Sequence, residues 1–360
     1  MGIRVRKNRE FTLLAAGLIL LAVSAALQMM ARRTAWFGPW YASYIYPPIS
    51  AAFARFFGLF PFSVAELLIY ILFLACLVYG IRHLKDWKKM AAGTFFLISA
   101  LFFIYTVNCG VNYYRRPFSN YLEYRAGRYS KEELEELLGW LTDEVNASYT
   151  ETGLQTKDGI QREAVRAMNK LGEQYPQLSG YYPIPKPLLI SRILSVQQLS
   201  GIYSPFTVEA NYNAEMTPYN IPHTVCHELS HLRGFMREDE ANFIGFLACI
   251  GADDAEYRYS GCLMGWIYAG NALAEVNHGS YAGYWNRLRP EVQEDLRENT
   301  AFWERFDSKV SKAAETLNNT YLKANSQTDG VRSYGRAVDL MLAWYLSGEA
   351  QQTVAGGGTS

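Results

Sequence analysis

The segment HTVCHELSHLRGFMREDEAN, residues 223–242, decides how the second half of the chain is interpreted. His227 and His231 are four residues apart, so on an α-helix their imidazoles lie on one face, about one turn from each other. Both rings can then reach one metal ion at about 2.0–2.1 Å, the usual zinc–nitrogen distance. Glu228 is the next residue around the helix and can act on a zinc-coordinated water as a general base. The segment therefore predicts an HExxH zinc site with His227 and His231 as ligands and Glu228 as the catalytic residue.

A catalytic zinc needs a third protein ligand, and the acidic cluster that follows the motif is the nearest supply. Gly234 can end the first helix, and a second helix that begins at Glu238 would present this carboxylate to the ion. Asn242 lies four residues later on the same face and can orient a ligand by hydrogen bonding. Glu240 points about 200° away from Glu238, so the two are not expected to ligate together. Glu238 is the preferred ligand, Glu240 the alternative, and His223 is expected to support the site or to be unrelated to it.

Each part of this pattern has an ordinary structural explanation as well. Acidic residues are favoured in the first turn of any solvated helix by the helix dipole. That explanation accounts for the acids, but it does not account for their place directly after HExxH and before a strongly apolar helix. We therefore favour the zinc site.

Three apolar stretches in the first 116 residues are long enough to cross a hydrocarbon core of about 30 Å as helices. They cover residues 11–31, 61–81 and 91–114. The first is longer than the ~7–15 apolar residues of a signal peptide, and two more follow, so we predict an anchor of three transmembrane helices. The shorter apolar stretches within residues 241–274 are expected to be core helices, with membrane helices as the alternative.

Lysine and arginine residues predict the orientation of these spans. They precede the first span and join the second to the third, at Arg4, Arg6, Lys7, Arg9, Arg82, Lys85, Lys88 and Lys89. The positive-inside rule then places the N-terminus in the cytoplasm and the chain after residue 114 outside, although Arg115 and Arg116 oppose it. The lipid bilayer is thus an expected partner.

The remainder has the composition of a soluble domain, which we place at residues 117–350. Helical patterns dominate it, and GIYSPFTVEANYN, residues 201–213, is typical of one or two strands. The expected fold class is mainly α with a small β element (α+β), in which a zincin-like metallopeptidase domain follows the anchor. Residues 351–360 are expected to form a disordered tail. With 34 basic and 34 acidic residues the net charge is zero, so no nucleic-acid partner is indicated, and the five cysteines do not suggest a disulfide framework.

The sequence resembles an uncharacterised family of bacterial membrane proteins in which three N-terminal spans precede a zinc-peptidase-like domain. The resemblance rests on HELSHLRGFMREDEANF and GIYSPFTVEANYN, with NYYRRP after the third span and DGVRSYGRAVDL near the end. Glu238 to Asn242 is similar to the third-ligand helix of gluzincin peptidases, including the thermolysin-like ones. Those peptidases separate the second histidine from the glutamate by a much longer segment. The gap of seven here is closer to the metzincin pattern, with Arg237 where that clan has its third histidine.

This resemblance implies a zinc metallopeptidase of the bacterial membrane with a peptide or protein substrate. The orientation predicted from the basic residues places its action outside the cytoplasmic membrane. It also implies that residues 206–213 form an edge strand for an extended substrate, and that Arg332 or Tyr334 stabilises the oxyanion. One alternative is a catalytically inactive zinc-binding sensor or scaffold of the membrane. Glu228 favours the enzyme, because a structural zinc needs no general base. A hydrolase that acts on an ester or a cell-wall amide is a further possibility.

Overall fold

The computed structural model describes residues 2–122, 129–150, 157–325, 334–350 and 353. The protein is mainly helical with one small sheet, as the sequence predicts. It divides into two compact units, Met1–Arg116 with Ser204–Glu209, and Pro117–Tyr203 with Ala210–Ser360. The segment 204–209, which we expected within the domain 117–350, therefore groups with the N-terminal unit. Apart from Thr353, the predicted tail 351–360 lies outside the described residues.

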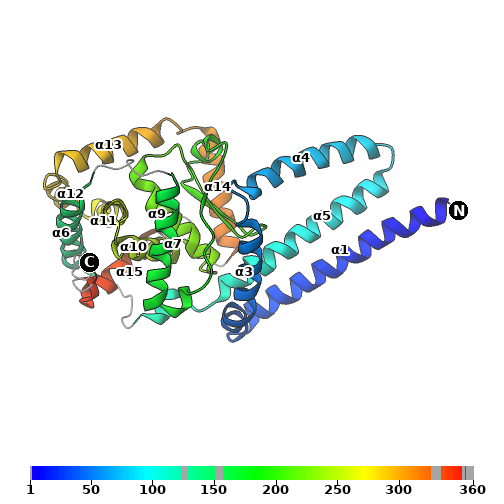
Figure 1. Cartoon of the computed structure of the whole chain (residues 1–360), viewed down its shortest axis with the longest axis horizontal. Coiled ribbons are helices and arrows are strands. Elements are labelled where there is room, and N and C mark those ends of the chain that lie inside the picture. Colours follow the sequence, from blue (N-terminus) through cyan, green and yellow to red (C-terminus); the bar gives the residue numbers. More distant parts are fainter. Residues whose placement is uncertain (1, 123–128, 151–156, 326–333, 351–352, 354–360) are drawn as a thin grey trace. The chain divides into compact units, whose positions relative to one another are not determined.

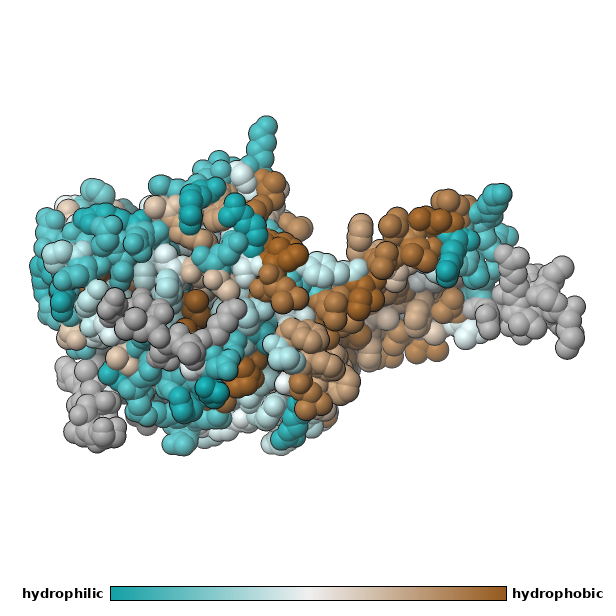
Figure 2. Space-filling model, turned by 45° about the horizontal axis from the view of Figure 1, so that its top comes forward, coloured by the Kyte–Doolittle hydropathy of each residue, from teal (hydrophilic) through white to brown (hydrophobic). Residues whose placement is uncertain are grey.

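Three long apolar helices dominate the N-terminal unit, and α5 packs against the other two (Figure 1). They are α1 (Gly2–Arg33), α4 (Val64–His83) and α5 (Trp87–Asn108). Each contains a stretch long and apolar enough to cross a membrane, and only 11–17% of that stretch is buried within the protein. Figure 2 shows the resulting apolar surface along these helices. Exposed apolar surface of this extent needs a covering, and lipid fits the length of the helices.

The ends of the spans differ from those expected because local capping sets them. The Ser63 hydroxyl accepts a hydrogen bond from the Glu66 backbone N–H at 3.1 Å, so α4 begins at Val64 and not at residue 61. The Asp86 side chain caps α5 in the same way. Helix α5 ends at Asn108, and the 3₁₀ helix η2 (Gly110–Tyr114) follows it. Tyr113 is buried there.

The chain between the first and second spans is helical as well, a feature that the sequence reading did not predict. It contains α2 (Phe37–Trp40), the π-helix η1 (Tyr41–Ile45) and α3 (Tyr46–Phe57). Aromatic side chains of this segment pack with α1 and η2 in a cluster of Ala31, Phe37, Tyr41, Tyr46 and Val111. The N-terminal unit therefore has a small core of its own beside the apolar helices.

A carboxylate holds the first turn of α4. The two carboxylate oxygens of Glu209 accept hydrogen bonds from the backbone N–H groups of Val64 at 3.2 Å and Ala65 at 2.7 Å. These N–H groups have no partner within their own helix, and the helix dipole favours negative charge at this end. This contact is one reason why the segment 204–209 belongs to the N-terminal unit.

The second unit is built almost entirely from helices. In chain order they are η3 (Phe118–Tyr121), α6 (Lys131–Ser148), α7 (Lys157–Gln174), η4 (Pro176–Leu178), α8 (Arg192–Val196), η5 (Pro218–Asn220), α9 (Ile221–Leu232), α10 (Glu238–Ile250), α11 (Ala255–Val276), α12 (His278–Trp285), α13 (Pro290–Glu304), α14 (Lys309–Ala324) and α15 (Tyr334–Leu346). Ser130 and Glu133 form a capping box at the start of α6.

Helix α10 lies in the centre of this unit and packs against α9, α11 and α15 (Figure 1). All of its residues after Glu238 are buried. With 13 residues it is too short to span a membrane, and neither α10 nor α11 is among the three candidate spans found in the described residues. The apolar stretches within 241–274 are thus core helices. Cys226, Cys249 and Cys262 are free thiols buried around them.

The sheet has three short strands in the order β1–β3–β2. Strand β1 (Lys186–Pro187) runs parallel to β3 (Glu209–Tyr212), and β2 (Gly201–Ser204) lies on the other side of β3. The expectation of an edge strand at 206–213 is therefore wrong, because β3 is paired on both sides. Residues 205–208 form a turn, in which Val208 has a φ of 54°, and β2 takes the edge.

Candidate metal centre

The HExxH segment forms α9, as the spacing predicts. Pro222 stands in its first turn, where a missing N–H costs nothing. Gly234 adopts a φ of 88° just after the helix, a conformation that other residues rarely take. The chain then turns and α10 begins at Glu238. Two helices joined by a five-residue turn thus supply the candidate ligands.

The structure brings His227, His231 and Glu238 together. The Nε2 atoms of the two histidines are 3.1 Å apart. One carboxylate oxygen of Glu238 lies 3.3 Å from Nε2 of His227, and the other lies 3.6 Å from Nε2 of His231. One ligand atom from each residue lies within 4.8 Å of the others, the arrangement needed to hold one ion.

These separations fit a tetrahedral zinc site. Ligand atoms that are each about 2.0–2.1 Å from an ion and related by tetrahedral angles lie about 3.3–3.4 Å from one another. The His227–His231 and His227–Glu238 separations, 3.1 and 3.3 Å, are close to this value, whereas His231 faces the other oxygen of Glu238 at 3.6 Å. A zinc ion held by one oxygen of Glu238 would therefore require an adjustment of that side chain.

Hydrogen bonding prepares His231 as a ligand. Its Nδ1 lies 2.7 Å from the backbone oxygen of Phe235, so Nδ1 carries the proton and donates to that carbonyl. The lone pair of Nε2 then points toward the cluster, as in most zinc-ligating histidines. His223 carries its proton on the other ring nitrogen, since its Nε2 lies 3.1 Å from the backbone oxygen of Asn242 and must donate to it. His223 is therefore a buried neighbour of the cluster and is not arranged as a ligand.

The charge states of these groups also suit a metal. Burial lowers the pKa of His231 to about 4, so this imidazole is neutral near pH 7. Burial alone would raise the pKa of Glu238, but the adjacent His231 and His227 outweigh it and lower this pKa to about 2. Burial would lower the pKa of His227, but the Glu238 carboxylate outweighs it and raises this pKa. A divalent cation would replace that proton as the counter-charge of Glu238.

Glu228 is buried beside the cluster, with only 4% of its surface exposed. Burial raises the pKa of this carboxyl to about 8, and a divalent cation beside it would lower this pKa, as a general base requires. Its Oε2 atom is buried and makes no hydrogen bond within the described part of the protein. A buried polar atom in this state costs free energy unless a ligand or a water meets it, which is typical of a functional carboxyl.

Gly201 on strand β2 makes room for Glu228. A Cβ atom at position 201 would lie 2.5 Å from Oε1 and 2.8 Å from Cγ of Glu228, closer than real Cβ contacts allow. The edge strand thus approaches the carboxyl as closely as backbone can. The sequence reading missed this residue, because a lone glycine in a strand signals a close approach without naming the partner.

The structure also separates the two acids that competed for the third ligand position. Oε1 of Glu240 accepts a hydrogen bond from the backbone N–H of Phe118 at 2.8 Å, and Glu240 is not part of the ligand cluster. Glu238 is the acid brought to the histidines. Asn242 lies close by, and its Oδ1 accepts a hydrogen bond from the Tyr268 hydroxyl at 3.2 Å. The two oxyanion candidates, Arg332 and the side chain of Tyr334, lie outside the described residues.

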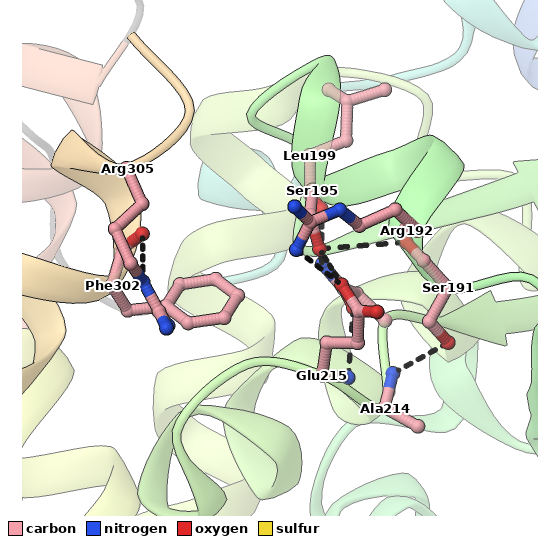
Figure 3. A network of polar contacts seen from close by, with 9 residues as sticks. Ser191, Arg192, Ser195, Leu199, Ala214, Glu215, Phe302 and Arg305 are labelled. Atoms are coloured by element: carbon pink, nitrogen blue, oxygen red, sulfur yellow. Dashed lines mark hydrogen bonds and ion pairs between the residues drawn. The ribbon is translucent and has the colours of Figure 1, made fainter.

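A polar network fixes the chain that leads from the sheet into α9 (Figure 3). The Ser195 hydroxyl donates to the Glu215 carboxylate at 2.8 Å and accepts from the Asn213 side chain at 2.9 Å. Arg192 lies 3.9 Å from the same carboxylate and 4.5 Å above the ring of Phe306. These contacts pin the loop after β3 to α8. They position the start of the HExxH helix and have no part in the ligand cluster.

Comparison with known proteins identifies a family and no relative of established activity. The family described as "Protein of unknown function (DUF3810)" matches residues 41–342. No curated protein and no solved structure matches the chain. The match includes the second and third apolar helices, both helices of the ligand cluster and most of α15.

Proposed function

The chain belongs to the DUF3810 family, and we propose that it is a membrane-anchored, zinc-dependent metallopeptidase with a zincin-like domain. The observation that carries the proposal is the cluster of His227, His231 and Glu238 at distances suited to a tetrahedral ion. Two helices, α9 and α10, supply all three ligands. Glu228 follows the first ligand directly and is buried beside the cluster.

The described residues offer three ligands, one fewer than a structural zinc site uses, and this number and the buried carboxyl support a catalytic role. When bound, zinc lowers the pKa of a coordinated water toward about 7 and polarises a substrate carbonyl. Glu228 accepts the proton of the attacking water through its otherwise unbonded Oε2, and it later delivers a proton to the leaving amine. A structural zinc site closes with four protein ligands and needs no such acid. The catalytically inactive sensor or scaffold is therefore the weaker alternative.

The edge strand supports a peptide as the substrate. Strand β2 is the edge of the sheet in the part of the chain that the structure describes, and its first residue, Gly201, lies against Glu228. An extended peptide that pairs with β2 would run past the proposed general base. Its backbone would gain main-chain hydrogen bonds there, whereas an ester substrate without N–H groups would gain fewer.

The location follows from the apolar helices and the basic residues. We assign the protein to the bacterial cytoplasmic membrane as a multi-pass protein, with its N-terminus inside and the second unit outside. The three candidate spans and the basic loop between α4 and α5 support this assignment.

Metal analysis of the full-length protein in detergent, paired with a screen for peptide hydrolysis, tests the proposal. We expect one zinc per chain in the wild type and in Glu228→Gln, with hydrolysis only in the wild type. His227→Ala and His231→Ala should lose the zinc. A wild type that binds zinc and hydrolyses no peptide would favour the scaffold, whereas normal zinc content in both histidine variants would remove the site.

A further inference from the structure

A cavity in the helical unit, lined by residues outside the ligand cluster, has the composition of a carbohydrate site. Its volume is about 500 Å³, and it is bordered by α11, α12 and α13. Four aromatic side chains line it, namely Trp266, Tyr281, Trp285 and Trp303. None of them belongs to the ligand cluster, so the cavity needs an explanation of its own.

The rings form a fixed wall. The centroid of Trp266 is 5.7 Å from that of Tyr281 and 6.0 Å from that of Trp285. Trp266 itself is buried, and its indole N–H donates to the Thr142 hydroxyl at 3.0 Å. Tyr281, Trp285 and Trp303 are only half-buried. Each is therefore anchored by packing while part of its surface stays exposed, and the Arg297 guanidinium lies 5.9 Å from the centroid of the Trp285 ring.

Polar groups share the lining with these rings. Asn299 is the best fixed of them, because its Oδ1 accepts hydrogen bonds from the Asn220 side chain at 2.7 Å and the Trp303 indole at 3.0 Å. The Nδ2 end of this amide is then the end left to donate to a ligand. Asn271 and Asp307 add an exposed amide and an exposed carboxylate. The cavity lining, as far as the structure describes it, contains acidic residues and no lysine or arginine.

We propose that this cavity binds pyranose rings of a neutral or N-acetylated glycan. The C–H-rich face of a pyranose packs on flat aromatic rings, and its hydroxyl and acetamide groups pair with amides and carboxylates. Ligand sites commonly combine apolar walls with a few placed polar groups in this way. The carboxylate of Glu304 would disfavour an anionic sugar, whereas the carboxylate of Asp307 is paired with Lys312 at 3.2 Å.

The cavity and the candidate metal centre share structural elements. Gln198 lines the cavity and stands three residues before Gly201 on the same segment. Asn220, the partner of Asn299, is the N-cap residue of α9. Tyr268 follows the cavity residue Ile267 on α11 and donates to Asn242 beside the ligands. The substrate class that follows, which rests on the proposed function, is a peptide attached to a glycan chain.

Binding of defined oligosaccharides to the full-length protein tests the cavity independently of hydrolysis. The probes are a β-1,4-linked N-acetylglucosamine tetramer, a β-1,4-linked glucose tetramer and an anionic oligogalacturonate. The protein is held in a detergent without a sugar headgroup, which would otherwise compete. Tryptophan fluorescence and titration calorimetry should show binding of at least one neutral tetramer and none of the oligogalacturonate.

Matched variants test whether the oligosaccharide binds in this cavity or elsewhere on the protein. Trp285→Ala should weaken binding at least about tenfold through loss of stacking, and Asn271→Ala about fivefold through loss of one hydrogen bond. Asn271 is exposed, so its variant is expected to fold. Asn169→Ala, an equally exposed amide on α7, and Glu228→Gln should bind like the wild type. Failure of the wild type to bind either neutral tetramer, or unchanged affinity in both cavity variants, would overturn the inference while leaving the metal centre intact.

Discussion

Gly201 and Glu228 are in direct contact, because the glycine leaves space that a single methyl group would fill. A Cβ atom at position 201 would approach the Glu228 carboxylate to 2.5 Å. The edge strand and the proposed general base are thus fitted to each other across a long interval of sequence.

From this contact we predict that Gly201→Ala displaces Glu228 and spares the metal. A misplacement of about 1 Å near the reacting atoms can cost roughly 10²-fold in turnover, so a loss of this order is expected. Zinc content measured on the same preparation should equal that of the wild type. Gly283→Ala is the matched control, because a Cβ there meets no atom within 4 Å. Full turnover in Gly201→Ala would show that Glu228 is not held by this contact.

We predict that Glu238 and Glu240 have separable roles. Glu238→Ala should weaken zinc binding by more than ~100-fold, since loss of a supporting hydrogen bond alone typically costs 10–100-fold. Glu240→Ala removes the partner of the Phe118 N–H and should lower stability by about 1–3 kcal/mol without removing the zinc-binding atoms. Competition with a zinc chelator and thermal unfolding measure the two effects. Equal zinc affinity in Glu238→Ala and the wild type would mean that another group closes the coordination sphere.

We predict a pH-dependent gain in stability for Asp339→Asn. Burial raises the pKa of Asp339 from 3.8 to about 6, with Arg336 opposing the shift and Asp239 adding to it. Because the folded pKa is raised, ionisation destabilises the fold, and the penalty grows as the pH rises from about 4 through 6. The full shift corresponds to about 3 kcal/mol, and partial exposure reduces this to about 1 kcal/mol.

Asp339→Asn should therefore unfold at a higher temperature than the wild type at pH 7.5 and at the same temperature at pH 4. Asp143→Asn, which changes an exposed carboxylate, is the control. A variant difference that does not change between the two pH values would contradict the role assigned to Asp339.

We predict that the helical unit is outside the cytoplasm. Cys76 is the only one of the five cysteines that is exposed, so its replacement by serine gives a background in which single cysteines report accessibility. An impermeant maleimide added to intact cells should label Glu132→Cys on α6 and should not label Lys85→Cys in the basic loop. The reverse pattern would invert the orientation.

Local rules made much of this protein predictable from its sequence. Helix geometry predicts that His227 and His231 lie on one face, because they are four residues apart. The turn expected at Gly234 predicts that the next helix presents Glu238 to them. The three apolar helices follow from length and composition alone. What the sequence did not reveal depends on contacts between distant segments. The strand pairing on both sides of β3 is of this kind, and so is the placement of Gly201 against Glu228.

The helix that carries Glu238 also binds the chain near the start of the second unit, through Glu240 and Phe118. Glu238 and Glu240 lie in the first turn of α10. Glu238 faces the imidazoles of the two histidines, and Glu240 binds the backbone N–H of Phe118 near the start of this unit. Any movement that withdraws residue 118 would be transmitted to the Glu238 carboxylate through the first turn of α10. Assembly of the unit and closure of the ion site should consequently occur as one cooperative event.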